Sequence, residues 1–354
     1  AIDTQSGCTL IGYNTGTTIN HDDAVGTTAV GWSACENITS GQQNTAVGYS
    51  ALKANGTGDG NTAVGFNALL TCNVNESYHT AIGANALKLL DTNGANSNTA
   101  VGYNAGAVIL DGSENTIVGA FSGDAITSGI KNTTLGANAL SVASTALNNT
   151  AIGFNAMADV KAGVAVDGCV AIGYEALKGN SSNTTGINNT VAVGDSALKA
   201  LTTGAANTAV GYASATAMTV GRYNTSVGQE SLKAEDIGDW STAIGFSALF
   251  KQNTASGDNA VIGNTGVGAN AGYQNETGIN NTYLGYQAGK GASGQSNSNN
   301  TAVGKDALLA ITTGGTNTVM GGGAADALTT GGGNCIIGQA AGTATTDVDN
   351  TVII

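Results

Sequence analysis

The residues best suited to chemistry lie in the segment EDIGDW, where Glu235, Asp236 and Asp239 precede Trp240. Paired carboxylates can act as general acid and base on a glycosidic bond, and a neighbouring aromatic ring can stack on a sugar. The segment therefore predicts either a glycan-cleaving site or a binding loop at Asp239 and Trp240. A solvated loop without activity is the alternative interpretation, and it is the one we favour.

Histidine gives a second candidate, because His21 lies beside Asp22 and Asp23. A His–Asp pair can bind a metal or act as a base, but the sequence places no nucleophile near it, which favours a solvated loop. Loop Asp and Asn oxygens could hold Ca²⁺, yet the GGxGxD calcium motif is absent. We therefore predict no catalytic residue, no metal site and no cofactor.

The cysteines are five in number and include no CxxC pair, which argues against zinc. They occupy different positions of well-separated repeats, so we expect buried free thiols rather than a disulfide framework. They are Cys8, Cys35, Cys72, Cys169 and Cys335.

The composition excludes several classes of function. The chain has 54 glycines, no proline and a net charge of −13 without basic clusters. Nucleic-acid binding and binding to an anionic membrane surface both depend on Lys and Arg, so neither is expected. No apolar run approaches the ~18 residues of a membrane-spanning helix. The absence of proline suits a chain that consists mostly of backbone hydrogen-bond ladders.

These candidates must be positioned by a repeat that fills the chain. NTAVGYSAL, from Asn44 to Leu52, returns as NTAVGFNAL from Asn61 to Leu69. The motif glycine, here called the anchor glycine, recurs nineteen times; eleven of the eighteen intervals are seventeen residues, and the longest is twenty-three. The anchors are Gly12, Gly31, Gly48, Gly65, Gly83, Gly102, Gly119, Gly136, Gly153, Gly173, Gly194, Gly211, Gly228, Gly245, Gly268, Gly285, Gly304, Gly321 and Gly338.

Each position relative to the anchor has its own chemistry. The residue before the anchor is aliphatic in all nineteen repeats, as at Val47 and Val64, and Thr stands three before it in sixteen, as at Thr45. An aromatic residue follows the anchor in ten. Asn stands four before the anchor in thirteen repeats, among them Asn44, Asn61, Asn115 and Asn132, and His79 replaces it once.

The Thr-Ala-Val segment alternates as a β-strand does, with Thr and Val on one side and Ala on the other. We expect Val and Leu52 to be buried, Asn to form an amide ladder or occupy left-handed turns, and glycine to end the strand. The repeat then reads strand, bend, short strand and loop, although YSALKA could form a helical turn. The small residues Ala46, Ala63, Ala100 and Ala151 suggest a second packed face that another chain can approach.

Stacking is what makes such a short repeat stable. Burying its Val and Leu contributes ~1.5–3 kcal/mol each, whereas ordering every residue costs ~1–2 kcal/mol. One repeat cannot fold alone, but stacked copies pair above and below. We predict an all-β fold, a parallel β-solenoid or β-roll of about nineteen turns of 17–23 residues. It forms a single domain over 1–354, beginning its first full repeat near residue 8 and ending within a further one.

The motif N-T-A-V-G-Y-x-A-L resembles the repeat of phage tail fibres that end in an endosialidase-type self-cleaving chaperone. It is also similar to the S-V-A-I-G head repeats of trimeric autotransporter adhesins, most clearly at CVAIG (169–173) and TVAVG (190–194). The resemblance implies a left-handed trimeric β-roll outside the cell, used for reach and attachment. The repeat is longer than in the adhesin heads, and no stalk, membrane anchor or chaperone is apparent.

We therefore predict a non-enzymatic structural fibre protein, extracellular and associated with copies of itself. The unpaired strand edges at both ends would also allow end-to-end polymerisation. The alternative is a tailspike-type protein that binds or cleaves glycans. Inserts at 180–186, 253–260 and 293–299 lengthen the repeat. Such inserts form surface loops, so Asn180, Asn183 and Ser293 are candidates for contacting a receptor such as a cell-surface glycan.

Overall fold

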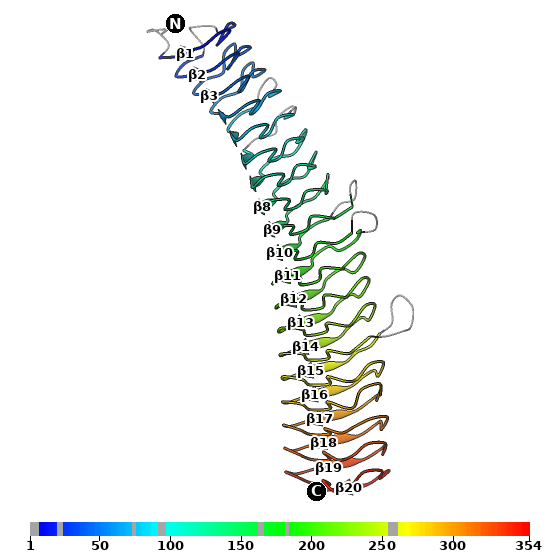
Figure 1. The fold of residues 1–354 in the computed structure, drawn as a ribbon. Coiled ribbons are helices and arrows are strands. Elements are labelled where there is room, and N and C mark those ends of the chain that lie inside the picture. Colours follow the sequence, from blue (N-terminus) through cyan, green and yellow to red (C-terminus); the bar gives the residue numbers. More distant parts are fainter. Residues whose placement is uncertain are drawn as a thin grey trace. The chain divides into compact units, whose positions relative to one another are not determined.

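The computed structural model describes residues 7–19, 24–72, 76–90, 97–161, 166–180, 184–253 and 261–354. Within these ranges the chain is all-β, with twenty short strands and no helix, and hence no helix that could cross a membrane. The chain divides into two compact units, the first reaching residue 172 and including 184–185, and the second comprising 173–180 and the residues from 186 onward. In each unit the turns follow one another in chain order (Figure 1).

Every turn contributes one strand, which has three residues in all but the last turn. The strands of the first unit are β1 (Thr9–Ile11), β2 (Thr28–Val30), β3 (Thr45–Val47), β4 (Thr62–Val64), β5 (Thr80–Ile82), β6 (Thr99–Val101), β7 (Thr116–Val118), β8 (Thr133–Leu135), β9 (Thr150–Ile152) and β10 (Val170–Ile172). Those of the second are β11 (Val191–Val193), β12 (Thr208–Val210), β13 (Thr225–Val227), β14 (Thr242–Ile244), β15 (Thr265–Val267), β16 (Thr282–Leu284), β17 (Thr301–Val303), β18 (Thr318–Met320), β19 (Cys335–Ile337) and β20 (Val352–Ile353).

Pairing is parallel and places equivalent residues over one another. Between β3 and β4, for example, Thr45 lies opposite Thr62 and Val47 opposite Val64. The same register joins consecutive strands throughout each unit, as between β12 and β13 and between β17 and β18. The predicted parallel β-solenoid of about nineteen turns is therefore confirmed.

The bend after each strand is neither a helical turn nor a second strand. Each anchor glycine has φ between +129° and +143°, and positive φ returns two and four residues later, at Ser50 (53°) and Leu52 (50°). A helix needs successive negative φ angles, so the helical interpretation of YSALKA is wrong, and the expected second short strand is not found in the described turns. The left-handed residue near the ladder is Gln43 (φ 55°), the neighbour of Asn44, rather than Asn44 itself.

The core lies on the alanine side of the strand, which corrects the expectation drawn from the sequence. Ala46 and Leu52 are fully buried, whereas Val47 is 38% exposed. The core is narrow because the leucine four residues after the anchor reaches it: a Cβ added to Gly266, at the alanine position, would lie 2.9 Å from Leu249 Cγ. Only a small residue fits there while leucine occupies the position four residues after the anchor. Ala46, Ala63, Ala100 and Ala151 are thus interior residues of this chain and offer no face to another.

The asparagines form the predicted amide ladder inside each unit. Asn132 Nδ2 donates to Asn115 Oδ1 (3.0 Å) and to the carbonyl of Ala146 (2.7 Å). Its Oδ1 accepts from the backbone amide of Asn149 at 3.1 Å. Asn132 is fully buried, so these bonds satisfy groups that water cannot reach. The ladder fixes the axial register of successive turns.

Replacing Asn132 with alanine should lower the free energy of unfolding by about 2–4 kcal/mol, because the Ala146 carbonyl and the Asn149 amide lose their partners in the interior. Asn132→Thr is the control and should cost less, since threonine retains one donor and occupies this position at Thr27 and Thr190. Urea unfolding followed by circular dichroism measures both. An unchanged midpoint for Asn132→Ala would contradict the structural role of the ladder.

Candidate functional site

The carboxylate segment 235–240 is packed into the solenoid rather than presented to a substrate. Glu235 is fully buried, and its Oε1 accepts the backbone amides of Ile237 (3.2 Å) and Gly238 (2.7 Å). Its Oε2 accepts Nε2 of Gln252 at 2.7 Å. Glu235 replaces the apolar residue that most turns place here, such as Ile109 or Leu201. The favoured interpretation of a solvated loop is therefore wrong for this residue.

The other acidic residues of the segment also accept hydrogen bonds from groups of the protein itself. Asp239 is buried, and its Oδ1 accepts a hydrogen bond from the backbone amide of Arg222 at 2.7 Å. Burial raises the pKa of this carboxyl, and the hydrogen bond from the Arg222 amide opposes that shift. Asp236 accepts the hydroxyl of Thr219. Each carboxylate binds its own partner, so they do not converge on one substrate position.

Trp240 is the exposed member of the segment. Its side chain is 54% exposed and stacks on Tyr223, with ring centroids 4.5 Å apart and planes 25° apart. This pair can contact another molecule through the indole face, as the sequence suggested for Trp240, although the adjacent carboxylates are committed elsewhere.

The remaining predicted residues are scattered. His79 is buried and its Nδ1 accepts the amide of Asn98 at 3.2 Å, so it takes the ladder position that the sequence indicated. Asn180 and Ser293 are exposed. His21, its neighbours Asp22 and Asp23, and Asn183 lie outside the described residues.

Neither cysteines nor acidic groups form a metal centre within the described ranges, where no three His, Cys, Asp or Glu side chains gather. Four cysteine thiols are free and buried, as predicted, and Cys335 is half-buried. Burial raises the pKa of Cys35 to about 12, which keeps its thiol protonated and unreactive.

The most extensive surface feature is apolar. We call the aliphatic residues that precede the anchor glycines the apolar stripe. Within each unit they stack in register along one side, where Val47 lies over Val64, and they remain partly open to solvent. Those most exposed are Ile11, Val47, Ile82, Leu135, Ile172, Ile244, Leu284, Met320 and Ile337.

An aromatic row accompanies the stripe on the other side of the anchor glycines. In the first unit Tyr13, Trp32, Tyr49 and Phe66 follow consecutive anchors, with centroids 4.3, 6.5 and 5.4 Å apart. All four rings are at least half exposed. Exposed apolar surface that continues from turn to turn is unusual for a protein that acts alone, so stripe and row together are the candidate functional site.

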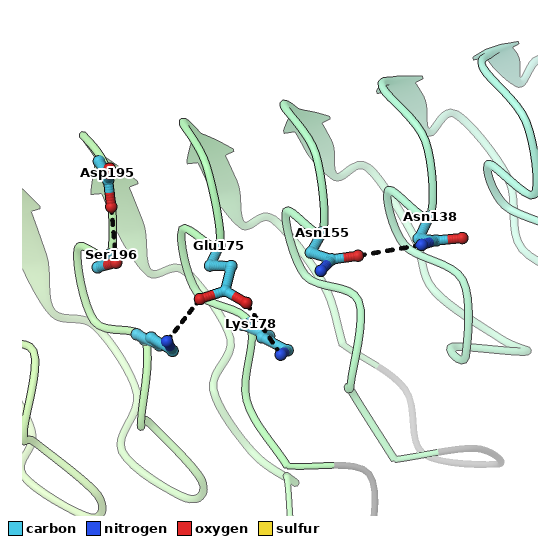
Figure 2. A network of polar contacts seen from close by, with 7 residues as sticks. Asn138, Asn155, Glu175, Lys178, Asp195 and Ser196 are labelled. Atoms are coloured by element: carbon cyan, nitrogen blue, oxygen red, sulfur yellow. Dashed lines mark hydrogen bonds and ion pairs between the residues drawn. The ribbon is translucent and has the colours of Figure 1, made fainter.

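Charged and amide pairs line the bend next to this site. In the second unit the Glu175 carboxylate binds the ammonium groups of Lys178 (3.1 Å) and Lys199 (2.5 Å) (Figure 2). The hydrogen bond from Lys199 is the main cause that lowers the pKa of the Glu175 carboxyl below its ordinary value, and Lys178 adds to it. In the first unit Asn138 Nδ2 donates to Asn155 Oδ1 at 3.2 Å. At Glu175 the position two after the anchor thus meets the position five after it, and at Asn138 it meets the same position of the next turn.

The stripe was not predicted from the sequence, because the alternation of a three-residue strand distinguishes its two sides without showing which side faces the interior.

No protein-family model matches the chain, and no curated protein matches it significantly.

Proposed function

We propose that this protein is a non-enzymatic structural subunit of an extracellular fibre, in which copies of the chain lie side by side along the apolar stripe. The observation that carries the proposal is that an aliphatic side chain precedes every anchor and stays partly exposed in both units, as at Leu135 and Leu284. Covering it removes apolar surface from water at ~25 cal/mol per Å².

The period of the stripe argues for a second copy of the same chain as the occupant. The apolar side chains recur once per turn, at the ~4.8 Å spacing of neighbouring strands. A partner stays in register along a whole unit only if it has the same axial period. A parallel copy meets this condition without any further constraint.

The number of chains in the fibre and its location outside the cell are proposed from the sequence resemblance rather than from the stripe. The resemblance to tail-fibre and adhesin repeats implies three chains, a position outside the cell and a role in attachment. The absence of catalysis is supported by the carboxylates of Glu235 and Asp239, which accept hydrogen bonds from the protein's own backbone. These contacts give no support to glycan cleavage.

Sedimentation velocity tests the assembly. The parent chain should sediment as a multiple of 34.6 kDa, with three copies expected. The combined variant Leu135→Asp, Ile244→Asp and Leu284→Asp should be monomeric, because each carboxylate would be desolvated at the interface.

The matched control places the same three charges on exposed aliphatic residues outside the stripe. Leu110, Val261 and Ile279 are also exposed, and their replacement by Asp should leave the mass unchanged. A monomeric parent chain at high concentration, or an oligomer that survives the stripe substitutions, would refute the proposed assembly.

A further inference from the structure

A hollow of about 360 Å³ opens on the surface of the second unit. Four successive turns line it, with Glu230, Phe246, Asn270, Tyr273, Gln274 and Lys290 as its principal side chains. All of them follow their anchor glycines, whereas the apolar stripe precedes them. The proposed assembly through the stripe therefore does not require these residues.

Two of the turns that line the hollow differ from the turn before them in the side chains of the bend. In the turn that follows Gly228, Lys233 lies five residues after the anchor and binds Glu230, two after it, at 2.6 Å. In the next two turns the lysine is replaced by Phe250 and then Tyr273, and the acid by Ser247 and Asn270. Aromatic rings and short polar side chains thus stand beside the hollow in these two turns.

The aromatic side chains are held in place without a ligand. Tyr273 stacks on Phe250 with centroids 4.8 Å apart and planes 4° apart, and Lys233 Nζ lies 5.5 Å from the Phe250 centroid. Phe246 also lines the hollow and is 49% exposed. Tyr273, whose ring is packed before binding, lowers the entropy cost of taking up a flat ligand.

The polar groups of the hollow are incompletely satisfied. Gln274 Oε1 is shielded from solvent and has no hydrogen-bond partner. Such a group is unfavourable, and a donor on a ligand would satisfy it once the Gln274 side chain turns toward the hollow. Within the described part of the chain, Lys290 makes no ion pair, and it lines the hollow together with Glu230.

We propose that this hollow binds a pyranose sugar. The apolar C–H face of the ring would lie against Tyr273 or Phe246, and its hydroxyls would donate to Gln274 Oε1 and Glu230 and accept from Lys290. Aromatic surface with a few convergent polar groups is the usual make-up of a small-molecule site. Lone pairs and charges of both signs suit a polyol better than a lipid or a phosphate ester. The site lies outside the segment 235–240 and goes beyond a purely structural role.

Saturation-transfer NMR on the full-length assembled chain tests the proposal. The probes are the methyl glycosides of glucose, galactose, mannose and N-acetylglucosamine. At least one should receive saturation, most strongly at its ring C–H protons. Absence of transfer to all four would overturn the proposal.

Two variants locate the binding. Gln274→Leu removes the unpaired acceptor and should weaken binding about fivefold or more, since one hydrogen bond contributes about 1 kcal/mol. Tyr273→Ala should abolish it. Tyr212→Ala is the matched control, because Tyr212 is an exposed aromatic residue of the same unit outside the hollow. Equal binding by Gln274→Leu and the parent, or loss in Tyr212→Ala, would contradict the assignment.

Discussion

An alanine at Gly48 should lower the free energy of unfolding of the first unit by about 2–6 kcal/mol. Its φ of +141° is strained for any residue with a side chain, at ~1–3 kcal/mol. The new Cβ would also lie 2.4 Å from the carbonyl oxygen of Gly65 in the next turn. That oxygen belongs to the backbone ladder, so relief requires separating two turns, which costs a further ~1–3 kcal/mol.

Calorimetry and hydrogen exchange measure the effect of Gly48→Ala. The melting temperature should fall, and the amide of Gly65, which donates to the Val47 carbonyl at 2.8 Å, should exchange faster than in the parent chain. Exchange is informative because the turns of a solenoid can open locally as well as globally.

Gly338→Ala separates the two causes. Gly338 has the same bend conformation (φ +129°), but a Cβ there would meet only Ala341 Cβ at 3.6 Å. Its replacement should therefore cost strain alone, ~1–3 kcal/mol. If both variants lose equal stability, backbone strain explains the anchor glycines and the close approach of consecutive turns has no energetic role.

The repeat made the architecture predictable, because strand positions that are mostly Thr, Ala and Val recur at a nearly constant spacing and stack on their equivalents in the next turn. Which side of the strand is interior was not predictable from hydrophobicity, since Val is more apolar than Ala and yet Val47 is the exposed residue. Volume decides instead. Leu52 fills the narrow interior and leaves room for a methyl group at Ala46.

A signal for this arrangement is present in the sequence. Where the alanine position holds a large residue, the leucine position of the same repeat holds a small one, usually glycine. The pairs are Leu10 with Gly16, Ile117 with Gly123, Tyr283 with Gly289, Val319 with Ala325, and Ile336 with Gly342. Two positions whose sizes vary in opposite directions share one space, which identifies both as core.

The hollow beside Tyr273 could not be found in the same way. Its lining requires knowing that residues two and five after the anchor meet across the bend, as Glu175 and Lys178 do. That contact depends on the alternating φ angles of the bend, which the amino-acid types do not indicate. Phe250 and Tyr273, which stand where the preceding turn has Lys233, therefore indicate a binding site only once the conformation of the bend is known.

Tyr283 is the strongest case of this exchange of volume, and its replacement by alanine should lower the free energy of unfolding by about 3–5 kcal/mol. The ring is fully buried, and its hydroxyl donates to Asn297 Oδ1. It occupies space left by glycines on both sides: a Cβ on Gly289 would lie 2.1 Å from Tyr283 Cε1, and one on Gly272 would lie 2.7 Å from Cδ2.

A double-mutant cycle tests whether Tyr283 and Gly289 share one volume. Gly289→Leu alone should be severely destabilising, because the ring has no room to move. Combined with Tyr283→Ala it restores the alanine–leucine pair of the other turns, so the two changes should compensate each other with a coupling energy of about 2–3 kcal/mol. Leucine tolerates the left-handed backbone of this position, as Leu308 does at φ 57°.

The control cycle pairs Tyr283→Ala with Gly323→Asn. Gly323 has no atom within 4 Å of an added Cβ, and asparagine occupies its position relative to the anchor in other turns, as at Asn270. These two changes should be additive to within about 0.5 kcal/mol. Additivity in the Tyr283–Gly289 cycle as well would mean that the two positions are sized independently. In that case the interior would be set by each residue's own burial, and the inverse pairing of sizes along the sequence would have no structural cause.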